Sequence, residues 1–278
     1  MFQYIPETFK GKIVLHEHNC EYLIWKRYAG IEKSLPKKLA LLNQASRIKK
    51  YERQICRKAD VILAAPNDIE ELVKIGADKQ KFLETYHLGD DSLLEQENLQ
   101  FQPDNNTLLY IGTLSWEANI DGLLWFYKDI FPLLKKKNPT IKLRIIGRHP
   151  DERLIRIAEN DKDIILEGFV EELEPYFRNS NVFITPLRFG SGIKVKVVNS
   201  LYMGIPCVTT SIGAEGLKTE DGEHMFIKDS PQEFADAINL LLTNKTIWDK
   251  ISNNAKALAR KYYTWDYVLE NIQKAVEK

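Results

Sequence analysis

The chain alternates short apolar runs with segments of helical pattern, and this alternation restricts its fold more than any other feature. Helical segments are expected at about 119–137, 151–160, 172–179 and 193–204. The apolar runs around them are TLLYIG (107–112), IKLRIIG (141–147), DIILEGFV (163–170), NVFITPL (181–187) and PCVTTS (206–211). Apolar strands that alternate with helices form a parallel sheet covered on both faces. The sequence therefore predicts an α/β fold.

A shorter α/β segment is expected earlier in the chain. KIVLHEHN (12–19) and VILAAP (61–66) are predicted strands, with a long helix between them. The helix IEELVKIG follows the second strand, with Asn67 or Asp68 as its N-cap and Gly76 where it should end. The first segment therefore has the same strand-and-helix order as the second.

The polar segment 95–106, with one proline and two asparagines, is the best linker candidate. We expect an N-terminal α/β domain over 1–102, which the family resemblance described below implies to be partial and to lie on the acceptor side. A complete C-terminal Rossmann-like domain with a parallel sheet is expected over 103–262, and a closing helix over 263–278.

Charge and cysteine content exclude several classes of protein. Lys plus Arg and Asp plus Glu both number 39, so no nucleic-acid partner is expected. No run approaches the ~18 apolar residues of a membrane helix. Three widely spaced cysteines, Cys20, Cys56 and Cys207, suggest free thiols in a reducing compartment rather than disulfides or a zinc site. A cytoplasmic location is expected.

Glycine-containing loops follow the predicted strands, at the sheet edge where such folds bind ligands. Gly190-Ser191-Gly192 lies between a strand and a helix, where small residues let backbone N–H groups approach an anion. Lys194 and Lys196 fall in the first turn of that helix and would neutralise a diphosphate. The alternative is that the glycines only form turns and that both lysines are solvated.

The segment PLRFGSGIKVKVVNSLYMGIPCVTTSIGAEGL (186–217) resembles the C-terminal domain of retaining, nucleotide-sugar-dependent glycosyltransferases of the GT-B fold, the large glycosyl transferases group 1 type family. Trp116 and Asn119 match the Trp-x-x-Asn signature of that family, and IIGRHP and LEGFVEELEPYF match its next two units. The residues of the segment in register are Pro186, Leu187, Gly190, Gly192, Lys194, Lys196, Gly204, Pro206, Val208, Thr210 and the run 213–217.

HEHNCE and ADVILAAPNDIEEL resemble the second half of the family's N-terminal domain. The resemblance implies a GT-B-like fold in which the N-terminal domain is truncated, because its first strands and helices are missing. It also implies a catalytic role for His18, since a histidine in this region lies beside the donor sugar and the acceptor. Ser191 and Glu215 fall near the donor sugar. The implied nucleotide and diphosphate ligands are Gly112, Thr113, Arg148, Phe169, Val170, Gly190, Gly192, Lys194, Lys196 and Asn199.

Three positions depart from the family pattern. The ribose-binding glutamate falls at Asn199, whose neutral amide accepts hydroxyl hydrogen bonds more weakly than a carboxylate does. The second glutamate falls at Ser191, and the arginine that often holds the diphosphate falls at Thr113. Lys194 and Lys196 are then the expected charge partners of the diphosphate.

No metal and no cofactor besides the nucleotide-sugar substrate are expected. His16-x-His18 has a metal-like spacing, but no other histidine, cysteine or acidic cluster completes a ligand set. His87 and His149 lie in predicted loops without ligand-like spacing.

Residues 26–58 contain eleven Lys or Arg and two Asp or Glu, a local charge of +9. Leu41, Ala45, Ile48 and Ile55 mark one helical face. The basic residues are either the solvated face of a packed helix or a contact surface for anionic lipid or a phosphate-bearing acceptor.

The sequence favours a glycosyltransferase of polysaccharide biosynthesis that moves a sugar, with retention, from a nucleotide sugar such as a UDP-sugar to a glycan or lipid-linked acceptor. It would lie in the cytoplasm, with peripheral contact to the inner membrane face. The alternatives are a non-catalytic nucleotide-sugar-binding subunit that partners a complete enzyme, and a sugar-nucleotide epimerase. A homo-oligomer or a partner subunit is also expected, because a partial domain exposes a sheet edge.

Overall fold

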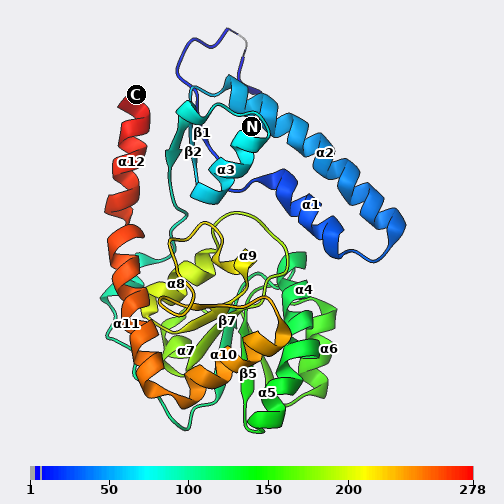
Figure 1. Ribbon diagram of the computed structural model, residues 1–278, viewed down its shortest axis with the longest axis vertical. Helices are drawn as coiled ribbons and strands as arrows, with labels where there is room; N and C mark the ends of the chain where they lie inside the picture. Colours follow the sequence, from blue (N-terminus) through cyan, green and yellow to red (C-terminus); the bar gives the residue numbers. More distant parts are fainter. Residues whose placement is uncertain (1–3, 7, 278) are drawn as a thin grey trace. The chain divides into compact units, whose positions relative to one another are not determined.

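The computed structural model describes residues 4–6 and 8–277 and divides into two compact units (Figure 1). Unit 1 comprises residues 1–87, 189–193 and 265–278, and unit 2 comprises 88–188 and 194–264. Residues 1–3, 7 and 278 lie outside the described residues, so the outermost parts of the predicted N-terminal domain and closing helix are not described.

Unit 2 is built on a six-stranded, all-parallel sheet in the order β6-β5-β4-β7-β8-β9. The five predicted strands are confirmed, and only the two-residue β9 was not predicted. The bounds are β4 Thr107–Ile111, β5 Lys142–Ile146, β6 Ile164–Gly168, β7 Val182–Thr185, β8 Cys207–Thr209 and β9 Phe226–Ile227.

Helices cover both faces of this sheet (Figure 1). The core between sheet and helices holds fully buried aromatic side chains, among them Tyr110, Tyr202, Phe183 and Trp248. The helices are η3 Asp91–Glu95, α4 Glu117–Trp125, α5 Phe131–Lys137, α6 Glu152–Asn160, α7 Glu174–Arg178, α8 Val195–Met203, α9 Ser211–Ala214, α10 Pro231–Thr243 and α11 Lys245–Tyr262.

The helix predicted over 119–137 is interrupted. A π-helical turn, η4, spans Phe126–Ile130 between α4 and α5. Pro132 lies at the start of α5 and lacks the N–H that a continuous α-helix would need there. The wider π-helical turn before the proline accommodates the missing hydrogen bond, so the proline is a local cause of the interruption.

Unit 1 is built on a three-stranded parallel sheet, β1 Val14–His16, β2 Val61–Ala64 and β3 Phe82–Glu84. β2 is central, and its side chains alternate between the two faces. Ile62 and Ala64 join a core with Cys56 of α2 and Leu72 of α3, whereas Val61 and Leu63 pack with Ile272 of α12. The helices are α1 Glu21–Ile31, α2 Leu35–Lys58, α3 Pro66–Lys74 and α12 Trp265–Glu277, with a short 3-10 turn η2 Lys79–Lys81.

The predicted packed face of α2 is confirmed. Leu41 and Ala45 are buried, and Ile48 packs against the core of unit 1. The predicted N-cap of α3 is wrong, because Pro66 occupies the first helical position and Ala65 is the cap residue.

Asp68 serves α1 instead of α3. Its carboxylate accepts a hydrogen bond from the backbone N–H of Cys20, 3.2 Å away. Glu52 of α2 accepts from the N–H groups of Glu21 (2.5 Å) and Tyr22 (3.2 Å). Two buried carboxylates thus satisfy three N–H groups at the start of α1, which has no side-chain cap from its own segment.

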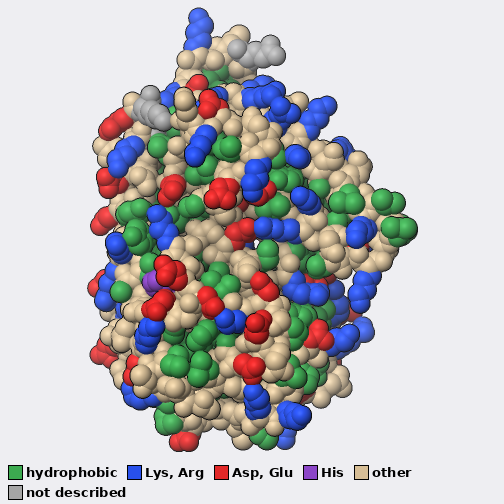
Figure 2. All heavy atoms as spheres, viewed as in Figure 1, with side chains coloured by type: hydrophobic (Ala, Val, Ile, Leu, Met, Phe, Trp, Pro, Cys, Tyr) green, Lys and Arg blue, Asp and Glu red, His purple; other side chains and the backbone are tan. Residues whose placement is uncertain are grey.

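The three cysteines are buried free thiols. Within residues 4–6 and 8–277, no helix combines the length and apolar character needed to cross a bilayer. Positively and negatively charged side chains are intermixed over the face drawn in Figure 2.

Replacing Glu52 with alanine should release the start of α1, because the buried N–H group of Tyr22 and the part-buried N–H group of Glu21 would lose their acceptor. An unmet buried donor costs about 1–3 kcal/mol. We expect the amides of 21–31 to exchange faster in hydrogen–deuterium exchange, while the exposed Glu70→Ala of α3 leaves them unchanged. Unaltered protection in Glu52→Ala would show that the carboxylate does not hold the helix.

Candidate functional site

A pocket of about 440 Å³ opens at the carboxyl ends of β4, β5 and β6 in unit 2. The predicted ligands Gly112, Thr113, Arg148, Phe169 and Val170 all line it. The structure therefore brings together five residues that lie up to 58 positions apart in the sequence, as the rule for parallel sheets requires.

Two glycines let the backbone fold tightly at the floor of this pocket. The N–H of Gly112 donates to the carbonyl oxygen of Ile146 (2.9 Å), and that of Gly147 donates to Gly168 (2.8 Å). A Cβ built on Gly147 would overlap the carbonyl oxygen of Gly112. On the wall, the guanidinium of Arg148 lies 3.9 Å from the ring centroid of Phe169, and both side chains are exposed. A flat, exposed cation–π pair of this kind offers a stacking surface for a planar ring.

Lys196 occupies the first turn of α8, as predicted. Its Nζ donates to Tyr110 Oη (2.8 Å) and to Asn119 Oδ1 (2.6 Å), and it lies 4.5 Å from the centroid of the Tyr110 ring. A Cβ at Gly112 would lie 2.9 Å from this Nζ. The glycine therefore keeps the ammonium close to the backbone at the pocket's edge.

Asn119 connects Lys196 to the loop after β4 through two hydrogen bonds of its side-chain amide. Its Nδ2 donates to the carbonyl oxygen of Thr113 (2.8 Å) while its Oδ1 accepts from Lys196. The Trp-x-x-Asn spacing arises because Trp116 is the N-cap residue of α4 and Asn119 lies one turn later, facing inward. Asn119 and Tyr110 were not predicted as site residues. The asparagine of the Trp-x-x-Asn motif was the sequence signal that could have indicated Asn119.

Burial lowers the pKa of Lys196 from its ordinary value to about 7, and the neighbouring charge of Lys194 lowers it further in the same direction. Both hydrogen-bond acceptors of this Nζ, the Tyr110 hydroxyl and the Asn119 amide oxygen, are neutral, and within residues 4–6 and 8–277 no carboxylate accepts a hydrogen bond from it. An anion placed here would reverse the shift, because opposite charge favours the protonated amine.

Lys194 is the N-cap residue of α8 and is 8% exposed, so its predicted alternative as a solvated surface residue is wrong. Its Nζ lies 3.6 Å from Glu215 Oε2. The carboxylate predicted near the donor sugar is therefore joined to a cation predicted near the diphosphate.

Asn199, the predicted ribose partner, lies on α8 and holds the segment before η3. Its Oδ1 accepts from the N–H of Asp90 (3.1 Å). A Cβ on Gly89 would overlap this oxygen. The amide at this position thus has a structural contact that the sequence did not indicate.

Gly190, Ser191 and Gly192 belong to unit 1 by their contacts. Arg27 donates to the carbonyl oxygen of Gly190 (2.7 Å), and Ser191 Oγ donates to Asp68 (3.0 Å). Gly192 has a φ of 72° and approaches the carbonyl oxygen of His18 so closely that a Cβ would lie 2.6 Å from it. Only glycine fits there without strain.

His18 follows β1 in unit 1 and is not alone. Its ring centroid lies 4.7 Å from that of His16 and 4.2 Å from that of His87, while His16 and His87 stack at 5.2 Å. The expectation that no further residue completes the His16–His18 pair is therefore wrong. Partial desolvation and, after it, the neighbouring His18 lower the pKa of His16. Burial and both neighbouring imidazoles lower the pKa of His87 to about 4.

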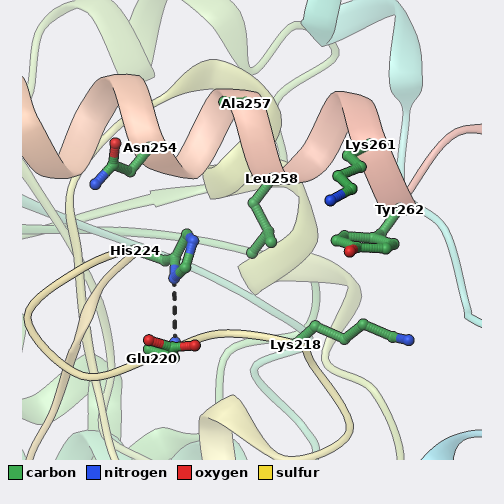
Figure 3. Close-up of a pocket in the computed structure, with 8 residues that line it drawn as sticks. All are labelled: Lys218, Glu220, His224, Asn254, Ala257, Leu258, Lys261 and Tyr262. Atoms are coloured by element: carbon green, nitrogen blue, oxygen red, sulfur yellow. Dashed lines mark hydrogen bonds between the residues drawn. The ribbon is translucent and has the colours of Figure 1, made fainter.

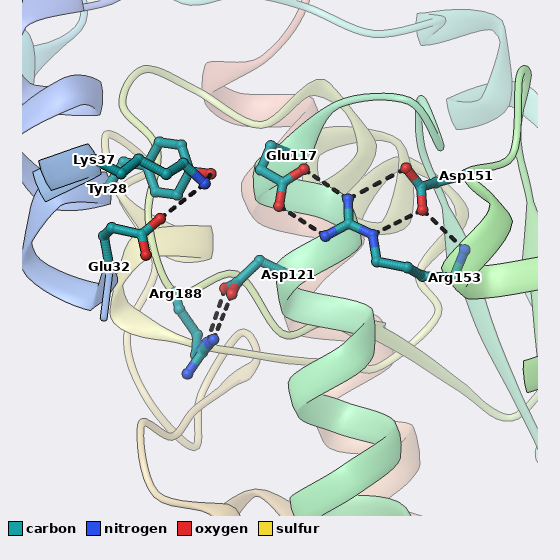
Figure 4. Close-up of polar contacts among 8 residues, drawn as sticks. All are labelled: Tyr28, Glu32, Lys37, Glu117, Asp121, Asp151, Arg153 and Arg188. Carbon is teal, nitrogen blue, oxygen red and sulfur yellow. Dashed lines mark hydrogen bonds and ion pairs between the residues drawn. The ribbon is translucent and has the colours of Figure 1, made fainter. Parts of the chain in front are cut away.

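Ion pairs brace the helices around the pocket of unit 2 (Figure 4). Arg153 of α6 donates to both carboxylate oxygens of Glu117 at the start of α4 (3.0 and 2.8 Å) and to Asp151, the N-cap of its own helix. Arg188 forms a two-bonded pair with Asp121 of α4. These pairs hold the N-terminal half of α4, which carries Asn119. In unit 1, Lys37 contacts Glu32 at 2.8 Å and Tyr28 at 2.9 Å.

A second pocket of unit 2, about 430 Å³, contains none of the predicted residues (Figure 3). Lys218 and Lys261 lie 5.1 and 4.9 Å from the ring centroid of Tyr262, and His224 Nδ1 accepts from the N–H of Glu220 (3.2 Å). The pocket at the strand ends is therefore the candidate site.

Among known proteins, a chain of Klebsiella pneumoniae described as an uncharacterized 44.6 kDa protein in cps region is 26% identical over 272 residues, which cover 95% of this chain and 68% of that one. Sucrose-phosphate synthase of Thermosynechococcus elongatus superposes with a TM-score of 0.74 at 14% identity, over 98% of this chain and 68% of that chain. TarM of S. aureus, in a complex that contains UDP, superposes with a TM-score of 0.71 at 14% identity, over 84% of this chain.

The match spans 47% of the TarM chain, so it corresponds to about half of that structural relative. At these identities the superpositions establish the shared GT-B fold. The family model described as Glycosyl transferases group 1 matches residues 105–244, which make up half of the chain and include all six strands of the sheet that carries the pocket. The chain belongs to the glycosyl transferases group 1 family.

Proposed function

We propose that this protein transfers a sugar, with retention, from a nucleotide-sugar donor to a glycan or lipid-linked acceptor. The observation that carries the proposal is the half-buried Lys196 side chain, whose ammonium lies beside Gly112 at the edge of the pocket of unit 2. A cation held there by neutral partners suits a diphosphate, and the family match supplies the class of reaction. The relative described as lying in a cps region supports a role in polysaccharide biosynthesis.

The proposed nucleotide lies along the pocket. Its base stacks near Phe169 and Val170 beside Arg148, and its diphosphate reaches Lys196, Lys194 and the N-terminus of α8. The first N–H groups of a helix and its dipole favour an anion. Asn199 is the proposed ribose partner, because a carbonyl oxygen that accepts from Asp90 still has a second lone pair.

In the proposed transfer, the bond between the anomeric carbon and the diphosphate breaks, and negative charge develops on the leaving oxygen. The cationic groups at the start of α8 stabilise that charge, and no metal ion is assigned to this role. Glu215 of unit 2, paired with Lys194, is proposed to lie toward the donor sugar. For unit 1, we propose donor-sugar contact by Ser191 and a catalytic role for His18, as the resemblance implies.

One observation favours the alternative of a non-catalytic nucleotide-sugar-binding subunit. The two positions where the family's acidic residues fall, Asn199 and Ser191, are engaged in hydrogen bonds with Asp90 and Asp68. Turnover of a panel of nucleotide sugars with glycan and lipid-linked acceptors distinguishes the two functions. Sugar transfer supports the enzyme, whereas UDP binding without any turnover supports the subunit.

We further propose that α2 contacts anionic lipid at the inner membrane face. Leu35, Leu39 and Leu42 are 66, 59 and 42% exposed and recur at helical spacing, so they form an apolar ridge. Exposed cations such as Arg47 and Lys50 lie on the same helix. An apolar ridge with basic neighbours is typical of helices that lie in a membrane surface.

Lys196→Met should weaken UDP binding by about 1.5–3 kcal/mol, since one charge-assisted contact is lost. Uridine, which has no phosphate, should bind as it does to the unchanged protein. Calorimetry with both ligands measures this, with the exposed Lys136→Met on α5 as the matched control. Equal losses for UDP and uridine would contradict a phosphate contact.

UDP binding should also take up a proton above neutral pH. In the free protein the pKa of Lys196 is about 7, so the amine is mostly neutral at pH 8. A neighbouring phosphate raises this pKa, and UDP affinity should therefore fall as pH rises from 6 to 9. Calorimetry at pH 8 in buffers of different ionisation enthalpy should show an uptake approaching one proton, and Lys196→Met should abolish it. No uptake would mean that the phosphate lies elsewhere.

The protein should sediment with anionic vesicles and be released as salt rises, because salt screens exposed charges. Replacing Leu35 and Leu39 together with serine should reduce sedimentation, whereas Leu240→Ser on α10, also exposed, should not. Equal binding to neutral and anionic vesicles would contradict the proposed contact.

A further inference from the structure

Three imidazoles from distant parts of the chain meet at one edge of the sheet of unit 1. His16 is the last residue of β1, His18 lies two residues beyond it, and His87 follows β3. β1 and β3 are parallel and flank β2, so their carboxyl ends lie at the same edge. The fold itself therefore assembles the group.

The candidate ligand nitrogens of these three side chains all lie within 4.8 Å of one another. His87 is half-buried, and its Nε2 is shielded from solvent with no hydrogen-bond partner among the described residues. A shielded ring nitrogen without a partner is unfavourable unless something binds it. His16 and His18 are exposed, so an ion from solvent can reach the cluster.

The three imidazole nitrogens indicate which metal ions the cluster could bind. Imidazole nitrogen is a common ligand of zinc, copper, nickel and cobalt, whereas magnesium and calcium prefer oxygen. The residue between the two exposed histidines, Glu17, interacts with Glu52 and Asp68, and it is not part of the cluster. Three histidines with no carboxylate therefore favour a first-row transition metal.

The spacing fits such an ion after a small movement. Metal–nitrogen bonds of about 2.0–2.1 Å at tetrahedral angles place ligand nitrogens roughly 3.3 Å apart. Rotation of the exposed His16 and His18 side chains can close the difference without moving the strands. Three protein ligands also leave a fourth position for water.

We propose that His16, His18 and His87 together bind one divalent transition-metal ion, of the zinc class. The site shares no residue with the proposed diphosphate cluster around Lys196. It would also occupy a nitrogen of His18, so metal binding and sugar contact by that imidazole would compete.

The test uses the full chain without an affinity tag, because a histidine tag would bind the same ions. Calorimetry with Zn²⁺ should show one ion per chain, and Co²⁺ should give the visible absorption of a tetrahedral nitrogen site. His16→Ala and His18→Ala should each lower Zn²⁺ affinity at least about tenfold, since even losing a group behind a ligand costs that much. His224→Gln, which alters a histidine of unit 2, is the matched control and should bind as before.

Both ligand variants replace exposed side chains, and the melting temperature without metal should stay unchanged, which separates ligand loss from misfolding. Absence of saturable Zn²⁺ binding would overturn the proposal. So would binding that survives both His16→Ala and His18→Ala, or that is lost equally in His224→Gln. His87→Asn provides a third variant, whose normal Zn²⁺ affinity would likewise exclude the site.

Discussion

The Lys196 ammonium is the constraint around which the candidate site of unit 2 is arranged. Burying a charged group is costly unless it is paired, and the contacts described for this Nζ come from a phenol and an amide. Gly112 leaves room for it, and Asn119 ties it to the loop after β4. Burial and, after it, the neighbouring charge of Lys194 lower the pKa of the amine. A bound diphosphate would supply an opposite charge and favour the protonated amine.

In unit 1 the buried charged groups are anionic, in contrast to the Lys196 ammonium of unit 2. There the buried charges are carboxylates, and Glu52 and Asp68 accept hydrogen bonds from the unmet N–H groups at the start of α1. The same Asp68 accepts from Ser191, so the glycine-rich segment is fixed by the group that fixes the helix. Burial raises the pKa of Glu52 to about 7. The backbone hydrogen bonds act against this rise, because they favour the ionised form.

Much of the fold was predictable because its signals are local. The strands of unit 2 are apolar runs bounded by turns, and α8 begins and ends within two residues of its predicted limits. The pocket followed from one topological rule, which places Gly112, Arg148 and Phe169 at the same edge although they belong to three different strand ends.

The parts that could not be predicted depend on contacts between distant residues. α1 has no cap within its own segment, so its start is defined by carboxylates from α2 and α3. His87 lies far along the chain from His16, and no spacing rule connects them. The contact of Asn199 with Asp90 depends on how the segment before η3 folds onto α8. In each case the contacting residue is distant in the sequence, and only the tertiary fold brings it close.

The most direct measurement is a crystal structure of the chain with UDP bound. We expect phosphate oxygens within hydrogen-bond distance of Lys196 Nζ and near the first N–H groups of α8, with the uracil beside Phe169. UDP found in another pocket, such as the one beside Tyr262, would contradict the proposed site. So would UDP at the strand ends with its phosphates turned away from Lys196.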